Sequence, residues 1–281
     1  MKATTKQILV VTAWFTVLLA VIGGTMLWQH QVRKPRHAVT AVTVTSTERI
    51  PTLLLLDPVL DAEQQRQLVA TMQRNNGSQS VMTIKAFKNG TLKFSGSLRD
   101  SDNRPYLNIQ LPTSLSAKRQ AELIQAIVTT AESRFKFSCY NLVSYGQGGL
   151  IATHYLENTT KQLTPRHFIA IAAPFNGTDT SDNDQSTAAV ALSKRTATLK
   201  RLVTKRGIIN PKIKVLIIAG NAKGRRNGDG VVPVQSALAA QSIFKPIVKN
   251  YQQTVIHSWQ AGHASLPGSW KLGNAIQEFM N

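Results

Sequence analysis

The chain has almost no cysteine, and this excludes several classes of protein. Its 281 residues contain one cysteine, Cys139, so no intrachain disulfide can form and no disulfide scaffold is possible. Because Cys139 falls in an apolar stretch, we expect a buried, inert thiol in a strand. No cysteine lies near the N-terminus, which disfavours a lipid-anchored lipoprotein. The sequence also lacks metal-ligand spacing and the Walker and dinucleotide glycine motifs, so we expect no metal and no cofactor.

Acidic residues are scarce as well. Asp and Glu number 14 against 33 Lys and Arg, for a net charge of +19, and Asp229 is the only acid from residue 194 to 249. Such a field concentrates polyanions, which favours anionic lipid or a wall polymer as a partner of residues 194–226. The alternative is a solvated basic surface that keeps the protein soluble. Aromatic residues are not interleaved with these charges, so no nucleic acid is expected.

Long apolar runs are limited to one segment near the N-terminus. Residues 8–28 are uncharged and mostly apolar, and a helix needs about 20 such residues to span a bilayer core. No Ala-x-Ala cleavage site follows. We therefore expect an uncleaved signal anchor at 8–28, with a short basic tail at 1–7 before it and a stalk or linker at 29–50 after it. Basic residues flank the run on both sides, so charge does not settle its orientation.

From residue 51 onward, short apolar runs alternate with segments of helical periodicity. This alternation predicts one doubly wound, mostly parallel α/β sheet spanning residues 51–281. Residues 81–95 predict a hairpin, with a type I′ turn at Asn89-Gly90. Residues 176–211 interrupt the alternation and predict a basic, cap-like insertion. Its helical part places Leu199, Leu202 and Val203 beside the charges, as in an interfacial helix.

The most informative segment is Asn141-Leu-Val-Ser-Tyr-Gly-Gln-Gly-Gly149. It predicts a buried strand that turns sharply into a helix, which is the layout of a nucleophile elbow. The residue at the apex is Gly146, flanked two positions away by the small residues Ser144 and Gly148. Glycine tolerates the strained apex conformation but carries no nucleophile. The alternative is a glycine-rich turn that cradles a phosphate.

Two further residues follow predicted strands in the order nucleophile, acid, histidine. Asp229 lies between two glycines after the strand at 213–219, and His263 lies before the closing helix at 269–280. Ligands and catalytic groups of doubly wound sheets gather at the carboxyl ends of the strands. Asp229 and His263 are therefore candidates for the acid and base of a catalytic triad. A turn aspartate and an exposed loop histidine are the alternatives.

Together these segments resemble a family of bacterial cell-surface α/β-hydrolases related to lipases and esterases. The resemblance covers about residues 50–281. It rests on five motifs in the right order: Pro51-Thr-Leu-Leu-Leu-Leu, residues 141–149, Ala173-Pro-Phe-Asn-Gly177, Asp229-Gly-Val-Val-Pro, and His263 with the closing helix. It implies the α/β-hydrolase fold, Asp229 and His263 as triad acid and base, and a domain outside the cell membrane.

The chain departs from the family at two places. Gly146 stands where the family has its serine. The His-Gly pair that ends the family's first central strand is Leu56-Asp57 here, followed by Pro58, which has no N–H to donate to an oxyanion. The backbone N–H of Gln147 remains as a candidate oxyanion donor, and an inward-facing Asp57 would repel negative charge.

These departures predict a membrane-anchored, cell-surface protein with a catalytically degenerate hydrolase domain that acts by binding. The alternative is an active serine hydrolase with a displaced nucleophile. Ser144 is the nearest candidate, although it lies two residues before the apex. Ser265, close to His263, is the other.

Overall fold

The structure is a computed structural model and describes residues 14–27, 49–74, 77–159, 164–224 and 228–281. The chain divides into two compact units, residues 1–42 and residues 43–281, which are considered separately below.

In the first unit the described residues 14–27 form a helix. Its apolar side chains are exposed, Trp14, Phe15 and Leu27 among them. No helix in the described part of the chain combines the length and apolar character that crossing a membrane requires. The remainder of the anchor predicted at 8–28, the tail at 1–7, and the predicted stalk apart from residues 49–50 lie outside the described residues.

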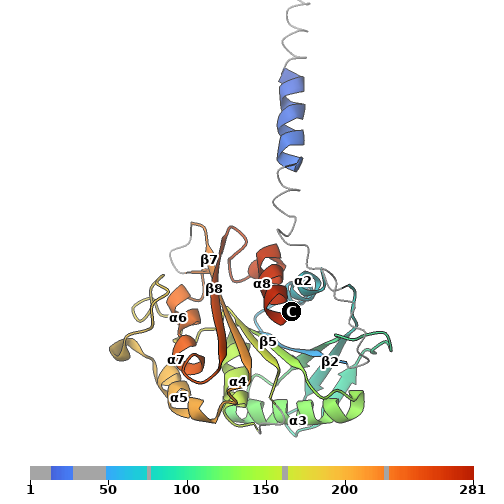
Figure 1. The fold of residues 1–281 in the computed structure, drawn as a ribbon, viewed down its shortest axis with the longest axis vertical. Helices are drawn as coiled ribbons and strands as arrows, with labels where there is room; N and C mark the ends of the chain where they lie inside the picture. The colour runs from blue at the N-terminus through green and yellow to red at the C-terminus, as the bar shows by residue number, and fades with distance from the viewer. Residues whose placement is uncertain (1–13, 28–48, 75–76, 160–163, 225–227) are drawn as a thin grey trace, which may run out of the picture. The chain divides into compact units, whose positions relative to one another are not determined.

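The second unit contains an eight-stranded sheet in the order β3-β2-β4-β1-β5-β6-β7-β8 (Figure 1). Only the β2–β3 pair is antiparallel, while every other neighbouring pair is parallel. The sheet is therefore the predicted doubly wound, mostly parallel one. The strands are β1 (Thr52–Leu55), β2 (Val81–Ala86), β3 (Leu92–Ser95), β4 (Tyr106–Gln110), β5 (Asn141–Tyr145), β6 (His167–Ile171), β7 (Lys214–Ala222) and β8 (Asn250–Ser258).

Helices cover both faces of the sheet, as Figure 1 shows, with α3 and α4 on one side and α2 and α8 on the other. The main helices are α2 (Ala62–Gln73), α3 (Ala117–Phe135), α4 (Gln147–Leu156), α5 (Ala197–Lys205), α6 (Val234–Leu238), α7 (Gln241–Phe244) and α8 (Trp270–Met280). Residues 234–244 form two short helices, α6 and α7, instead of one.

Strand alternation divides the interior into two cores. In β1, Leu53 and Leu55 enter the core shared with α3 and α4, whereas Leu54 enters the core shared with α2 and α8. Successive side chains of a strand point to opposite faces, so a strand covered on both sides is apolar throughout. This explains why the central strands appear in the sequence as continuous apolar runs.

Two local predictions need correction. The β2–β3 hairpin exists, but its turn is not type I′, because Gly90 has a positive φ of 89° and Asn89 does not. The Gly90 N–H donates to the Phe87 carbonyl and the Phe87 N–H to the Thr91 carbonyl, which indicates a longer loop with its glycine in the left-handed region. Cys139 lies before β5, not in a strand, and is partly exposed.

The basic insertion also differs from its predicted form. Leu199 and Leu202 of α5 are fully buried in the main core, so this apolar face does not point to a membrane. The amphipathic pattern reflects burial against the domain itself. Two other apolar side chains of the insertion, Leu192 and Ile208, are 73% and 54% exposed.

Candidate functional site

The elbow predicted from the sequence is present. β5 ends at Tyr145 and α4 begins at Gln147, and Gly146 between them has φ 53° and ψ −129°. This conformation is strained for any residue with a Cβ and free of steric cost for glycine. The Gly146 N–H donates to the Ile171 carbonyl at 2.9 Å, which ties the apex to the end of β6. The backbone therefore keeps the shape of a nucleophile elbow.

Close packing of α4 on the sheet depends on the glycine after the apex. A Cβ on Gly148 would lie 2.9 Å from the carbonyl carbon of Leu55, and closer still to its oxygen. Both atoms are backbone, so neither can move aside cheaply. Gly148 therefore lets the start of α4 approach the end of β1, and this brings residues after β1 beside the apex.

Asp229 and His263, separated by 34 positions in the sequence, form a hydrogen-bonded pair. The His263 Nδ1 lies 2.7 Å from the Asp229 Oδ2. Asp229 is buried, and its Oδ1 accepts the N–H groups of Val231 and Val232 at 2.9 and 2.6 Å. Because a carboxylate only accepts, the His263 Nδ1 is the donor in this hydrogen bond, which leaves Nε2 as the ring nitrogen that can face a substrate. This is the arrangement of a triad acid and base.

Tyr145 supports this histidine and was not identified from the sequence. Its hydroxyl donates to the His263 backbone carbonyl at 2.6 Å, and the two rings meet edge to face with centroids 5.2 Å apart. Burial raises the pKa of Tyr145 well above 10, and the nearby charges of Asp229 and Asp57 raise it further. The hydroxyl stays protonated and fixes the loop that carries His263. In the sequence, the only feature that could have identified Tyr145 is its position immediately before the elbow apex.

The space above Gly146 is occupied by the Asp57 side chain. The Gln147 N–H donates to the Asp57 Oδ2 at 2.9 Å, and the Val59 N–H donates to the Oδ1 at 2.9 Å. The Asp57 residue is 5% exposed. The Gln147 N–H, expected to be an oxyanion donor, thus already binds a carboxylate of the chain itself. Pro58 follows Asp57, is exposed and has no N–H.

The two alternative nucleophiles lie in different surroundings. Ser144 is fully buried, and its Oγ donates to the Ile169 carbonyl at 3.2 Å. Ser265 is exposed, and its Oγ donates to the Gly262 carbonyl at 3.2 Å. Ser144 is thus packed beneath the elbow, as expected of the small residue two positions before the apex. The Ser265 hydroxyl is engaged by the backbone of its own turn.

A cleft of about 430 Å³ opens beside Asp57. Apart from Asp57, its polar lining is uncharged and rich in amides. Asp229 and His263 do not line it. The lining residues include Asp57, Pro58, Gln65, Asn108, Gln110, Gln120 and Gln147. The cleft therefore offers hydrogen-bonding groups next to one fixed negative charge.

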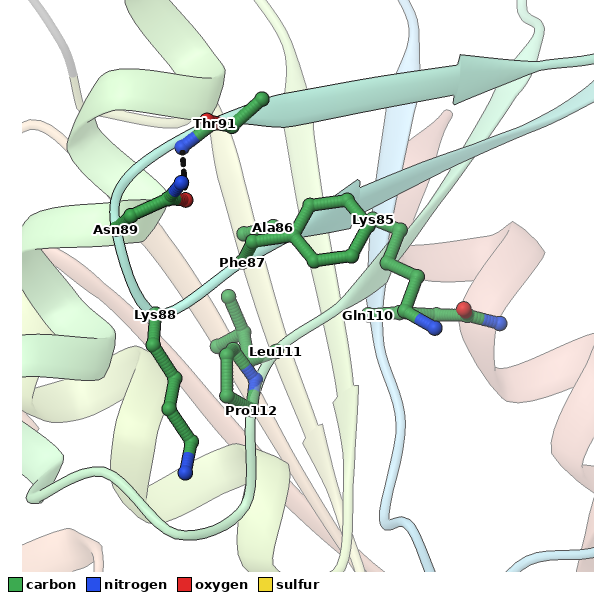
Figure 2. Close-up of a pocket in the computed structure, with 9 residues that line it drawn as sticks. All are labelled: Lys85, Ala86, Phe87, Lys88, Asn89, Thr91, Gln110, Leu111 and Pro112. Carbon is green, nitrogen blue, oxygen red and sulfur yellow. Dashed lines mark hydrogen bonds between the residues drawn. The ribbon is translucent and has the colours of Figure 1, made fainter.

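A second cavity of about 740 Å³ shares Gln110 and Leu111 with this cleft. Figure 2 shows Phe87 facing Leu111 and Pro112, with Lys85 and Lys88 to either side. The cavity thus has apolar walls and a basic rim, at the loop of the β2–β3 hairpin. Within the described residues no group of three His, Cys, Asp or Glu side chains could hold a metal ion.

The insertion is fastened to the elbow helix by an ion pair between a buried carboxylate and a partly exposed arginine. The Arg201 Nη1 of α5 lies 3.1 Å from the Glu157 Oε2, just after α4. Burial raises the pKa of Glu157 to about 7, although Arg201 and Lys205 act in the opposite direction. A second attachment comes from Arg206, whose Nη1 donates to the Ser242 carbonyl at 2.6 Å. A third comes from the Asn176 N–H, which donates to the Ser236 Oγ at 3.1 Å. The insertion is therefore a fixed part of the domain.

The family model described as "Alpha/beta hydrolase of unknown function (DUF915)" matches residues 40–281. The chain belongs to this family. The mostly parallel eight-stranded sheet agrees with the alpha/beta-hydrolase fold that this description names. No curated protein sequence matches the chain.

Two solved structures share the fold. A gene product of Listeria innocua superposes with a TM-score of 0.74 at 23% identity, over 83% of this chain and 94% of its own. A protein of Lactobacillus plantarum WCFS1, described as a cell surface hydrolase, has a TM-score of 0.69 at 22% identity, over 84% and 92%. At these identities the likeness concerns the fold alone.

Proposed function

We propose that this family member is a catalytically silent α/β-hydrolase domain at the cell surface that acts by binding a ligand in the cleft beside Asp57. One observation carries the proposal: the elbow apex is Gly146, and a buried carboxylate occupies the space above it. Serine hydrolases need a side-chain oxygen at the apex and free donors for the oxyanion. Here the oxygen is absent and the Gln147 N–H is engaged.

The retained Asp229–His263 pair does not restore serine catalysis by itself. A general base accelerates attack only when a nucleophile lies within hydrogen-bond reach. Within the described residues no hydrogen bond joins the His263 Nε2 to a serine hydroxyl. We assign the pair a structural part in this domain, in which it joins the loops that follow β7 and β8.

The test is covalent labelling of the purified domain with a fluorophosphonate probe, together with hydrolysis of a short-chain nitrophenyl ester. We expect neither reaction above the rate of a His263→Ala variant. An active serine esterase of similar size serves as the positive control. Labelling that disappears in the His263→Ala variant would refute catalytic silence. Ser144→Ala and Ser265→Ala variants would then identify the displaced nucleophile.

We further propose that the protein is a single-pass membrane protein whose hydrolase domain lies outside the cell. Support comes from the exposed apolar side chains of residues 14–27, which are costly to leave in water, and from the apolar sequence at 8–13. The structural neighbour described as a cell surface hydrolase agrees with this location. Protease treatment of intact cells should remove the domain, and its full protection would contradict the proposal.

A basic surface is proposed to contact an anionic component of the cell envelope. Lys194, Lys200 and Lys205 are exposed on the insertion, and the exposed Leu192 and Ile208 flank the same segment. The domain should sediment with phosphatidylglycerol vesicles and not with phosphatidylcholine vesicles. Binding should weaken steeply with salt, since exposed charges are screened beyond about 10 Å at 0.1 M. Binding that does not depend on salt would contradict a charge-driven contact.

A further inference from the structure

The Asp57 carboxylate is held in place by backbone groups on two sides. Its Oδ2 accepts the Gln147 N–H at the start of α4, and its Oδ1 accepts the Val59 N–H of its own loop, both at 2.9 Å. Burying a charge is costly unless hydrogen bonds compensate it. The start of a helix is also a favourable place for negative charge. Asp57 therefore occupies the position where an elbow would bind a negatively charged oxygen of a substrate.

The same carboxyl group excludes any side chain from the apex. A Cβ built on Gly146 would lie 2.9 Å from both the Cβ and the Cγ of Asp57, and nearer still to its Oδ2. Real Cβ atoms essentially never approach another heavy atom within 3.0 Å. The Oδ2 is not a freely moving end, because the Gln147 N–H holds it. A side chain at 146 and an aspartate at 57 therefore compete for one space.

We infer that Asp57 is a built-in occupant of the oxyanion position, and that positions 57 and 146 form a coupled pair that together set the chemistry of the site. The inference rests on the proposed function and identifies the Asp57 carboxylate as the group that prevents serine chemistry at the site. Introducing serine at 146 alone does not restore a reactive elbow. Serine chemistry returns only when the carboxyl group is removed as well, which frees the Gln147 N–H.

The coupling has a consequence for the ligand. A group that reaches this end of the cleft meets a carboxylate, where a serine hydrolase would present a donor N–H. Groups that donate hydrogen bonds, such as hydroxyls or amides, are therefore accepted there. Carboxylates and other anions are repelled, even though the protein as a whole is strongly basic.

The first test is a stability cycle that does not depend on catalysis. Gly146→Ser is made with Asp57 intact and combined with Asp57→Asn, Asp57→Ala and Asp57→Gly, and the unfolding equilibrium of each protein is measured in urea. With Asp57 intact, the serine should reduce the folding equilibrium constant about tenfold more than it does with Asp57→Gly, since contacting residues are energetically coupled.

The intermediate substitutions separate size from charge. Asparagine has the size of aspartate, so with Asp57→Asn the Gly146→Ser substitution should destabilise the protein as much as it does with Asp57 intact. Alanine at 57 retains a Cβ, and the Cβ of Asp57 lies 2.9 Å from where a Cβ at 146 would stand, so it should give an intermediate cost. An equal cost of Gly146→Ser in all four backgrounds would overturn the contact on which the inference depends.

The second test is reactivity with the fluorophosphonate probe. The Asp57→Gly/Gly146→Ser protein should label about 100-fold faster than Gly146→Ser alone, which is the scale of one oxyanion donor. A His263→Ala substitution in the double variant should abolish this gain. Equal labelling of the two proteins, or no labelling of a folded double variant, would overturn the blocking role of Asp57. Failure of the proposed function is distinct, because the unaltered protein would then label.

Discussion

The ion pair between Glu157 and Arg201 leads to a prediction about pH. Glu157 is almost completely buried, its Oε2 lies 3.1 Å from Arg201, and its Oε1 has no hydrogen-bond partner among the described residues. Burial raises the pKa of this carboxyl group from 4.5 to about 7. A carboxyl group with a raised pKa in the folded state binds protons more tightly when folded. Its contribution to stability is therefore complete below pH 4.5 and is lost as the pH rises through 7.

The size of the effect follows from the two pKa values. The difference between 4.5 and about 7 corresponds to roughly 3 kcal/mol at about 1.4 kcal/mol for each pKa unit. The Arg201 side chain beside Glu157 is partly in solvent, which weakens the desolvation of the carboxylate, so we expect about 2 kcal/mol. A Glu157→Gln variant has nearly the same shape and no titration. Relative to this variant, the wild type should lose about 2 kcal/mol of unfolding free energy between about pH 5 and pH 8.5.

Urea unfolding of both proteins at the two pH values measures this difference directly. Every other titrating group is common to both proteins, so its contribution cancels. The matched control is Glu63→Gln, which removes a carboxylate from an exposed pair with Arg66 and should show a much smaller pH-dependent difference. If the difference in unfolding free energy between the wild type and Glu157→Gln is the same at both pH values, Glu157 does not have a raised pKa in the folded protein.

Two further predictions concern other positions. Burial, followed by nearby positive charges, lowers the pKa of His167 from 6.5 to about 4. The stability that its neutral form contributes should be present above pH 6.5 and lost as the pH falls through 4, by up to about 3 kcal/mol. In urea unfolding, a His167→Gln variant should therefore lose less unfolding free energy than the wild type as the pH is lowered. An equal loss in both proteins would contradict this. Gly148→Ala should cost about 2–3 kcal/mol of unfolding free energy, because its Cβ meets the Leu55 backbone. Gly207→Ala, which meets nothing within 4 Å, is the control, and equal costs at both glycines would refute the close approach.

Much of the fold could be predicted from the sequence, because each central strand is buried on both faces and appears as an apolar run. From the order of Gly146, Asp229 and His263 along the chain, the last two were candidate partners in one site. In the structure the His263 Nδ1 lies 2.7 Å from the Asp229 Oδ2. The two residues meet because parallel strands deliver their carboxyl ends to one edge of the sheet. The catalytic roles of these residues remain predictions.

Other features depend on contacts that a sequence pattern does not contain. Leu199 and Leu202 are spaced as in a surface helix, and only the packed structure shows that the domain itself covers them. Tyr145 acts through a backbone carbonyl 118 positions away. The space that Asp57 fills is defined by the end of β1, the apex and the first turn of α4 together. The sequence indicated a charge near the site, and the occupied space became visible only in three dimensions.

The contact between Asp57 and Gly146 also bears on how such a site changes over evolutionary time. In an ancestor with serine at 146, loss of the apex side chain would open the space that an aspartate at 57 fills. Once the aspartate is present, a mutation back to serine at 146 meets its carboxyl group and is disfavoured before any activity returns. Reversal needs two changes, neither of which is useful alone. The pair thus makes reversion to a serine hydrolase difficult. We expect proteins that carry both residues to differ in the ligand they bind rather than to regain hydrolysis.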